Sequence, residues 1–111
     1  MKISLQNYHD VTVIELQGEV DGEMSDMLKD TIVETISHGR ARIVLDMSNV
    51  GGIDSEGLDS LLWIRDYTRE HHAQLRLAGL DENCEKILEI TRLQFEFDLH
   101  AELTEAVKSF A

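Results

Sequence analysis

Ser55 is the residue of this chain whose type and position point most directly to chemistry. It follows an apolar run, residues 43–45, and a segment with two glycines, and it precedes a stretch with helical spacing. Its hydroxyl can cap the free backbone N–H groups of a first helical turn, which is a purely structural role. The same place suits a phosphoryl group, because the N-terminus of a helix favours negative charge.

The segment before Ser55 is predicted to be a loop at the carboxyl end of a strand. Residues 48–54 follow the apolar run, and Gly51 and Gly52 would let the chain bend sharply there. In a parallel sheet, binding sites tend to form beyond the carboxyl ends of the strands. We therefore expect Ser55 to be exposed at such an end.

A hydrolase nucleophile is the competing chemistry for a serine between a strand and a helix. The nucleophile elbow needs Gly-x-Ser-x-Gly, but Ile53 stands at the place of the first glycine, and 111 residues are too few for the usual hydrolase sheet. The spacing pairs no histidine with Ser55, and the adjacent His71 and His72 cannot share one helix face as metal ligands. We predict that the chain is not an enzyme and holds no metal.

Length and charge limit the classes of partner. At 111 residues, the chain is predicted to form one domain spanning residues 1–111. Its net charge of −12 comes from 22 acidic and 10 basic residues. This charge argues against a nucleic-acid partner and against anionic membranes, because both need clustered Lys and Arg. It either favours solubility alone or also steers the chain toward a basic protein surface.

Cysteine usage and hydropathy indicate the compartment. The lone Cys84 cannot form an internal disulfide, and no second cysteine accompanies it in a redox motif. No stretch approaches the ~18 apolar residues of a membrane-spanning helix, and the first ten residues lack the apolar core of a signal peptide. We expect a soluble, cytoplasmic protein without membrane insertion.

The elements that must position Ser55 follow from the hydrophobic periodicity. Alternating or apolar runs predict strands at residues 2–7, 11–17, 42–47, 74–78 and 94–97. Helical spacing predicts helices from a cap at Asp21 or Ser25 to Gly39, from Ser55 onward, at 81–91 with Thr91 facing inward, and at 101–110. This ββαβαβαβα order predicts an α/β fold with a mixed, mainly parallel sheet and four helices.

The pattern resembles the STAS family, the domain shared by bacterial anti-sigma factor antagonists and the cytoplasmic tails of sulfate transporters. The main match is the apolar run 43–45, then Asp46, then Asp-Ser-Glu-Gly-Leu at residues 54–58, which is similar to the family's strand and Asp-Ser-Ser/Thr-Gly-Leu. A second match is Leu-Gln-Gly-Glu-Val-Asp at residues 16–21. A third is residues 88–93, followed by Phe95 and a last amphipathic segment. Together the matches imply one STAS-like domain over nearly the whole chain.

The resemblance implies an anti-sigma factor antagonist. Such a protein binds a histidine-kinase-like anti-sigma factor when unphosphorylated and so releases a sigma factor. The partner kinase uses ATP and Mg²⁺ to phosphorylate the serine at the position of Ser55, and a serine phosphatase reverses the step. This chain itself has no Gly-x-x-x-x-Gly-Lys loop for a nucleotide and is expected to need no cofactor. The expected partner-binding residues are Glu19, Asp21, Asp54, Glu56, Gly57, Asp59 and Trp63.

Three residues depart from the resembled pattern. Glu56 stands where the family usually has a second hydroxyl residue, Trp63 where a small residue is common, and Arg92 where a glycine is common. Trp63 is either part of a contact surface with Tyr67 or buried. The Glu56 departure keeps an alternative open, in which the chain is a STAS scaffold or transport-accessory protein that binds a partner without a serine phospho-switch.

Overall fold

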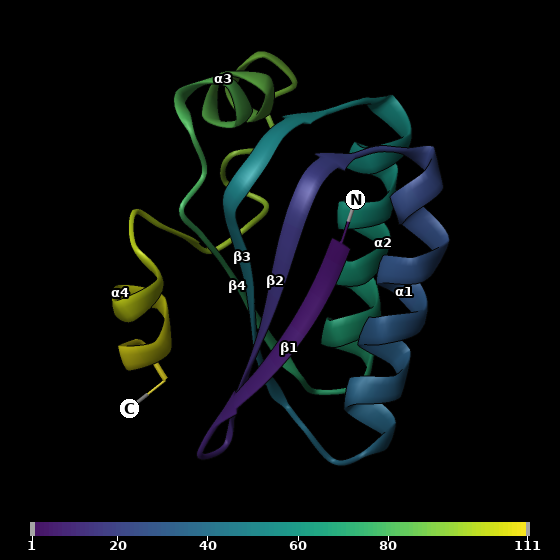
Figure 1. Ribbon diagram of the computed structural model, residues 1–111, viewed down its shortest axis with the longest axis vertical. Coiled ribbons are helices and arrows are strands. Elements are labelled where there is room, and N and C mark those ends of the chain that lie inside the picture. The colour runs from purple at the N-terminus through teal and green to yellow at the C-terminus, as the bar shows by residue number, and fades with distance from the viewer. Residues whose placement is uncertain (1, 111) are drawn as a thin grey trace.

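The chain folds into one five-stranded sheet with helices on both of its faces (Figure 1). The computed structural model describes residues 2–110. Within these residues the elements are β1 (Lys2–Tyr8), β2 (Val11–Val20), α1 (Gly22–Ser37), β3 (Arg42–Ile53), α2 (Ser55–Glu70), β4 (Gln74–Ala78), α3 (Glu82–Ile90), β5 (Leu99–His100) and α4 (Leu103–Lys108). The strand order is β1-β2-β3-β4-β5, with β1 antiparallel to β2 and the other neighbours parallel. The predicted α/β fold and its ββαβαβαβα order are confirmed.

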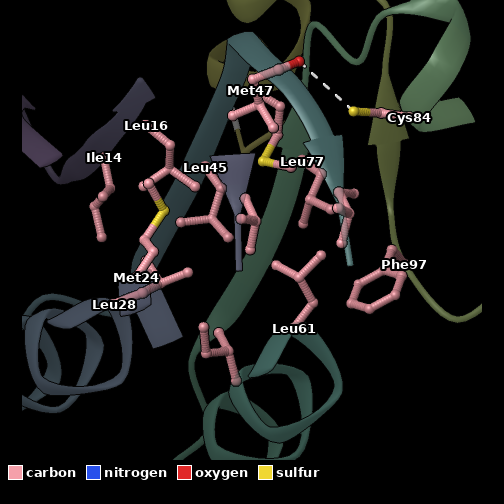
Figure 2. Close-up of a cluster of buried hydrophobic side chains, with 14 of the residues drawn as sticks. Ile14, Leu16, Met24, Leu28, Leu45, Met47, Leu61, Leu77, Cys84 and Phe97 are labelled. Atoms are coloured by element: carbon pink, nitrogen blue, oxygen red, sulfur yellow. Dashed lines mark hydrogen bonds between the residues drawn. The ribbon is translucent and has the colours of Figure 1, made fainter. Parts of the chain in front are cut away.

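The main core lies between the sheet and the helices α1 and α2. Alternate residues of β2 and β3 and one face of each helix meet there, as the periods of strand and helix require. Figure 2 shows side chains of this cluster, with Met24 and Leu28 from α1 and Leu61 from α2. A smaller cluster on the other face joins Val13 and Val44 to Ala106 and Phe110 at the C-terminal end. Because β3 is covered on both faces, it is the nearly continuous apolar strand that the sequence predicts.

The predicted loop before Ser55 is wrong. Strand β3 continues through residues 48–53, and it pairs with the end of β2, where Gly18 lies beside Val50 and Val20 beside Ile53. Neither Gly51 nor Gly52 has a positive φ angle, so these glycines do not bend the chain sharply. The pairing is irregular at two points along β2, and Gly18, with φ of 107°, lies in that region. The site therefore stands on an extended strand pair and not on a loop.

The last third of the chain also differs from the expectation. Residues 94–97 are not a strand, because the chain turns there and the fifth strand is the short Leu99–His100. Alternation of polar and aromatic residues suggested a strand, but Phe97 is buried while Phe95 is 91% exposed at the turn. Thr91 does not face inward: it is the exposed C-cap of α3, and its hydroxyl donates to the carbonyl of Ile87. The fourth helix is shorter than predicted, at Leu103–Lys108.

Candidate functional site

The helices α1, α2 and α3 begin in the same way, each after a parallel strand that ends at the same edge of the sheet. An aspartate caps each helix and accepts a hydrogen bond from the backbone N–H three residues later. Asp21 accepts from Met24 at 3.0 Å, Asp54 from Gly57 at 2.7 Å, and Asp81 from Cys84 at 2.8 Å. Of the two predicted caps for α1, the chain uses Asp21. Such caps satisfy N–H groups that the helix itself leaves without partners.

Ser55 is not the cap of α2. Asp54 fills that role, and Ser55 is the first residue with helical conformation, with an exposed side chain. Among the described residues, no hydrogen bond joins its hydroxyl to another group. The structural role considered for Ser55 is therefore filled by its neighbour, which leaves the hydroxyl accessible beside the N-terminus of a helix.

Gly57 fixes the first turn of α2 against the end of β2. A methyl group at this buried position would overlap the carbonyl oxygen of Val20, whose main chain passes directly beside it. The same carbonyl accepts a hydrogen bond from the N–H of Asp54 at 3.2 Å. The glycine is needed here for close approach of two backbones, because its φ angle is not positive. This contact sets the position of Ser55 relative to the neighbouring strand.

Glu56 reaches across to the other helix. Its carboxylate lies against Gly22, the first residue of α1, so that a side chain at Gly22 would collide with it. A carboxylate near the N-terminus of a helix is favourable by roughly 0.3–1 kcal/mol at an exposed site. The residue that departs from the resembled pattern thus connects the starts of α1 and α2.

The predicted acidic residues lie on the first turn of α2 and at the neighbouring junction of β2 and α1. The carboxylates of Asp54 and Glu56 flank Ser55 in the chain, and Asp59 follows one turn later on α2. Asp21 caps the adjacent helix, and Glu19 lies at the end of β2, where its carboxylate approaches Gly52. We call these residues and Ser55 the acidic rim. The acidic rim is therefore negatively charged and includes the exposed hydroxyl of Ser55.

Trp63 lies two turns away from Ser55 along α2 and is 38% exposed. Its ring stacks on Tyr67 at 5.0 Å, and the ammonium group of Lys29 on α1 lies 5.3 Å from the ring centroid. Tyr67 in turn stacks on His71 at 4.1 Å. The open question about Trp63 is settled in favour of partial exposure, since its ring is accessible on α2 rather than enclosed in the core.

Residues of α3 also reach the end of β3, although the sequence pattern did not indicate them as part of the site. The side-chain amide of Asn83 donates to the carbonyl of Gly51 at 2.9 Å, and the thiol of Cys84 donates to the carbonyl of Val50 at 3.6 Å (Figure 2). Burial, followed by the hydrogen bond to Asp81 and the charge of that carboxylate, raises the pKa of Cys84 to about 12. The available signal was the aspartate directly before each predicted helix, at 21, 54 and 81, because helices that follow parallel strands begin at the same end of the sheet.

Within residues 2–110, no group of three or more His, Cys, Asp and Glu side chains is placed to hold a metal ion. In the same part of the chain, no helix has the length and apolar character needed to cross a membrane. What the site presents is an exposed hydroxyl within carboxylates. The carboxylates attract basic groups and repel acidic ones. Among the described residues, no histidine is hydrogen-bonded to Ser55, so the site lacks a base next to the hydroxyl.

The fold and the rim define a class: a small α/β domain that presents a serine at the start of its second helix. The family model for the STAS domain matches residues 2–106. The anti-sigma F factor antagonist of Paenibacillus polymyxa is 23% identical over 94 residues, covering 84% of this chain and 80% of that protein. A crystal structure from Thermotoga maritima has a TM-score of 0.88 at 21% identity, covering 96% of this chain and 92% of that one. The Bacillus cell fate determinant SpoIIAA in its phosphorylated form has a TM-score of 0.74 at 19% identity, covering 99% of this chain and all 100% of that one.

The chain belongs to the STAS domain family. Its relatives and structural neighbours include proteins named anti-sigma factor antagonists. Proteins of this kind are regulators and generally not enzymes.

Proposed function

We propose that this protein is an anti-sigma factor antagonist controlled by phosphorylation of Ser55. The unphosphorylated protein binds a histidine-kinase-like anti-sigma factor, and binding releases a sigma factor. The observation that carries the proposal is the Ser55 hydroxyl, which is exposed at the first helical position of α2 while Asp54 provides the cap. The name of the relative in Paenibacillus polymyxa and the phosphorylated form of SpoIIAA support the same function.

Phosphorylation acts on the interface and leaves the fold in place. A phosphoryl group adds about −1.5 to −2 charge at neutral pH. The N-terminus of α2 favours that charge by roughly 0.3–1 kcal/mol, whereas the carboxylates of Asp54, Glu56 and Asp59 oppose it. These local effects nearly cancel. At an interface, however, like charges placed against each other cost several kcal/mol, which is a hundredfold or more in affinity.

The roles divide between this chain and its partners. The anti-sigma factor binds ATP and Mg²⁺ and transfers the phosphoryl group, and a serine phosphatase removes it. The chain, residues 1–111, supplies one STAS domain in the cytoplasm, performs no catalysis itself, and binds no nucleic acid. The proposed contact residues are the acidic rim, with Gly57 holding its geometry, and Trp63 farther along α2.

A second function remains open, because of Glu56. A carboxylate directly after the acceptor serine, directed at the start of α1, differs from the second hydroxyl of the resembled pattern. A kinase that requires a second hydroxyl residue at the position of Glu56 does not phosphorylate Ser55. In that case the chain is a scaffold or transport-accessory STAS protein that binds its partner constitutively.

Phosphate mapping separates the two functions. The purified protein is incubated with ATP, Mg²⁺ and a candidate anti-sigma kinase, and phosphate is located by mass spectrometry. We expect phosphate on Ser55, none on the Ser55→Ala variant, and unchanged Ser55 phosphate on Ser48→Ala, which removes another exposed serine close in sequence. If a kinase that modifies its own known substrate leaves Ser55 bare, the scaffold function replaces the phospho-switch.

A further inference from the structure

The outer edge of β1 pairs with no other strand among the described residues. Strand β1 ends the sheet, and its only neighbour is β2. The turn at His9 and Asp10 joins Tyr8 directly to its partner Val11 as a two-residue hairpin. In such a hairpin the two residues that flank the turn, Tyr8 and Val11, form a hydrogen-bonded pair, and every second pair along the strands is hydrogen-bonded as well. The residues of the pairs between them direct their N–H and C=O groups away from β2. The backbone groups of Ile3, Leu5 and Asn7 therefore point outward.

Open edges of this kind are normally protected. Natural proteins place charges, prolines or bulges on an edge strand to prevent pairing with another chain. Here 29% of all residues are charged, yet residues 3–8 contain no Asp, Glu, Lys, Arg or Pro. Leu5 is 50% exposed, and Tyr8 is exposed as well. The edge thus has the chemical character of a pairing surface.

Hollows flank this edge on both faces of the sheet. On the α1 side, a cavity of about 270 Å³ is lined by Leu5 and Asn7 and by residues of α1. On the α4 side, cavities of about 290 and 260 Å³ are lined by Ser4, Gln6 and Tyr8, with Leu103 shared by both. They arise where α1 and α4 stand beside a sheet that ends at β1. An added strand projects side chains alternately to both faces, so it would place them in these hollows.

We propose that β1 pairs antiparallel with β1 of a second copy of this chain, which joins two sheets into one. The strand is complementary to itself about a two-fold axis at Leu5. Leu5 then lies opposite Leu5 of the second copy, Ile3 opposite Asn7, and Ser4 opposite Gln6. No two like charges face each other, since Lys2 lies opposite Tyr8.

The charge of the molecule favours this strip for self-association. Each copy carries −12, so contact through most of the surface places carboxylates against carboxylates. The strip at residues 3–8 carries no charge itself, and the carboxylates that line the flanking hollows are those of Glu34 on one face and of Glu15 and Asp46 on the other. The remaining long-range repulsion is screened by salt, because the Debye length falls from about 10 Å at 0.1 M to about 3 Å at 1 M. Dimerisation through β1 therefore strengthens as the salt concentration rises.

Sedimentation equilibrium of the full chain tests the dimer. We expect the wild-type mass to rise from 12.6 kDa toward twice that value with concentration, and more steeply in high salt. Leu5→Lys places two ammonium groups opposite each other and weakens association by about tenfold or more. The matched control is Met27→Lys on α1, since Met27 is 48% exposed and the charge change is the same. This control dimerises like the wild type.

Cross-linking provides a readout that does not depend on a charged variant folding. Under oxidation, Leu5→Cys forms a covalent dimer, whereas Met27→Cys does not. The wild type supplies a clean background because its Cys84 is fully buried. The proposal is overturned if the wild type stays monomeric at every concentration and salt, if folded Leu5→Lys dimerises as well as the control, or if dimeric Leu5→Cys gives no disulfide. A strand from another protein at this edge would be consistent with the first of these results.

Discussion

The starts of α1 and α2 are a pair that shares its structure and differs in its chemistry. Both helices follow parallel strands whose ends lie side by side, with Val20 next to Ile53. Both are capped by an aspartate that binds the N–H of the third helical residue. The first helical residue, however, is a glycine in α1 and Ser55 in α2. The capping chemistry is common to both helices, and only α2 carries a hydroxyl at its first residue.

The two starts also differ in what covers them. The carboxylate of Glu56 lies over the first residue of α1, whereas the first turn of α2 is held from below by the backbone of β2 beside Gly57. One start is thus shielded by a movable side chain, and the other is seated rigidly with its outer surface open. A rigid, open start is the better place for a group that a partner must recognise, since it needs no rearrangement to be presented.

The largest expected effect concerns Ser55 and a candidate anti-sigma partner. Ser55→Asp adds a charge at the open start and lowers partner affinity by about a hundredfold or more, because like charges then meet at the interface. Ser55→Ala keeps wild-type affinity. Isothermal titration calorimetry with the unphosphorylated chain measures both. Ser37→Asp, at the exposed far end of α1, controls for added charge. Equal affinity of Ser55→Asp and Ser55→Ala would contradict the phospho-switch.

The second effect compares the stability of variants at the start of α2, which packs against β2, and at the start of α1, which is covered by Glu56. Gly57→Ala forces a methyl group into the Val20 carbonyl and lowers the free energy of unfolding by about 2–3 kcal/mol. Gly22→Ala meets only the end of the Glu56 side chain, which can move aside, and alanine stabilises a helix relative to glycine by about 0.5–1 kcal/mol. Urea unfolding compares the two variants. If Gly57→Ala is as stable as Gly22→Ala, the close seating of α2 is wrong.

Much of this comparison was visible in the sequence. Helical and strand periods predicted the element order, and Asp54, Ser55 and Glu56 were recognised as neighbours of a helix start. Periodicity does not show how far a strand continues, so the extension of β3 through residues 48–53 was missed. That extension depends on pairing with β2, which is a contact between distant parts of the chain. The role of Gly57 depends on the same pairing.

The failed prediction in the last third has a local cause as well. Arg92 has a φ angle of 62° where the chain leaves α3. A second turn, closed by a hydrogen bond from the N–H of Glu96 to the carbonyl of Leu93 at 3.0 Å, takes the place of the expected strand at 94–97. Glycine is the usual residue for this left-handed conformation, and the resembled family commonly has one there. Because arginine gives no such signal, the sequence concealed the turn. The contact of Glu56 with α1 was equally hidden, since it arises only when two strand ends lie side by side.

The third effect concerns α3, whose start shares the aspartate cap but buries a thiol. The pKa of Cys84 is raised from 9.0 to about 12, so the folded chain holds this proton after the unfolded chain has lost it. The contribution to stability is complete below pH 9 and is lost progressively as the pH rises from 9 to 12. The slope is about 1.4 kcal/mol per pH unit.

Urea unfolding at several pH values between 8 and 11 measures this slope. In Cys84→Ala the thiol is gone, and the unfolding free energy declines less steeply than in the wild type, although its value at pH 8 is lower because a cavity remains. The difference between the two slopes isolates the thiol from the other groups that titrate in this range. Parallel curves would show that Cys84 ionises in the folded chain as readily as in the unfolded one.

The smallest effect tests whether the caps themselves are equivalent. Asp21→Ala and Asp54→Ala each leave one N–H group without its acceptor and lower the free energy of unfolding by about 1 kcal/mol. Asn retains the acceptor without the charge, so Asp54→Asn costs clearly less than Asp54→Ala in urea unfolding. Equal losses for the two alanine variants place the difference between the helices in Ser55 and Gly57 alone. A markedly larger loss at Asp54 would mean that its side chain also stabilises the hydrogen bond from its own N–H to the carbonyl of Val20. The cap of α2 and the packing of α2 against β2 would then depend on each other.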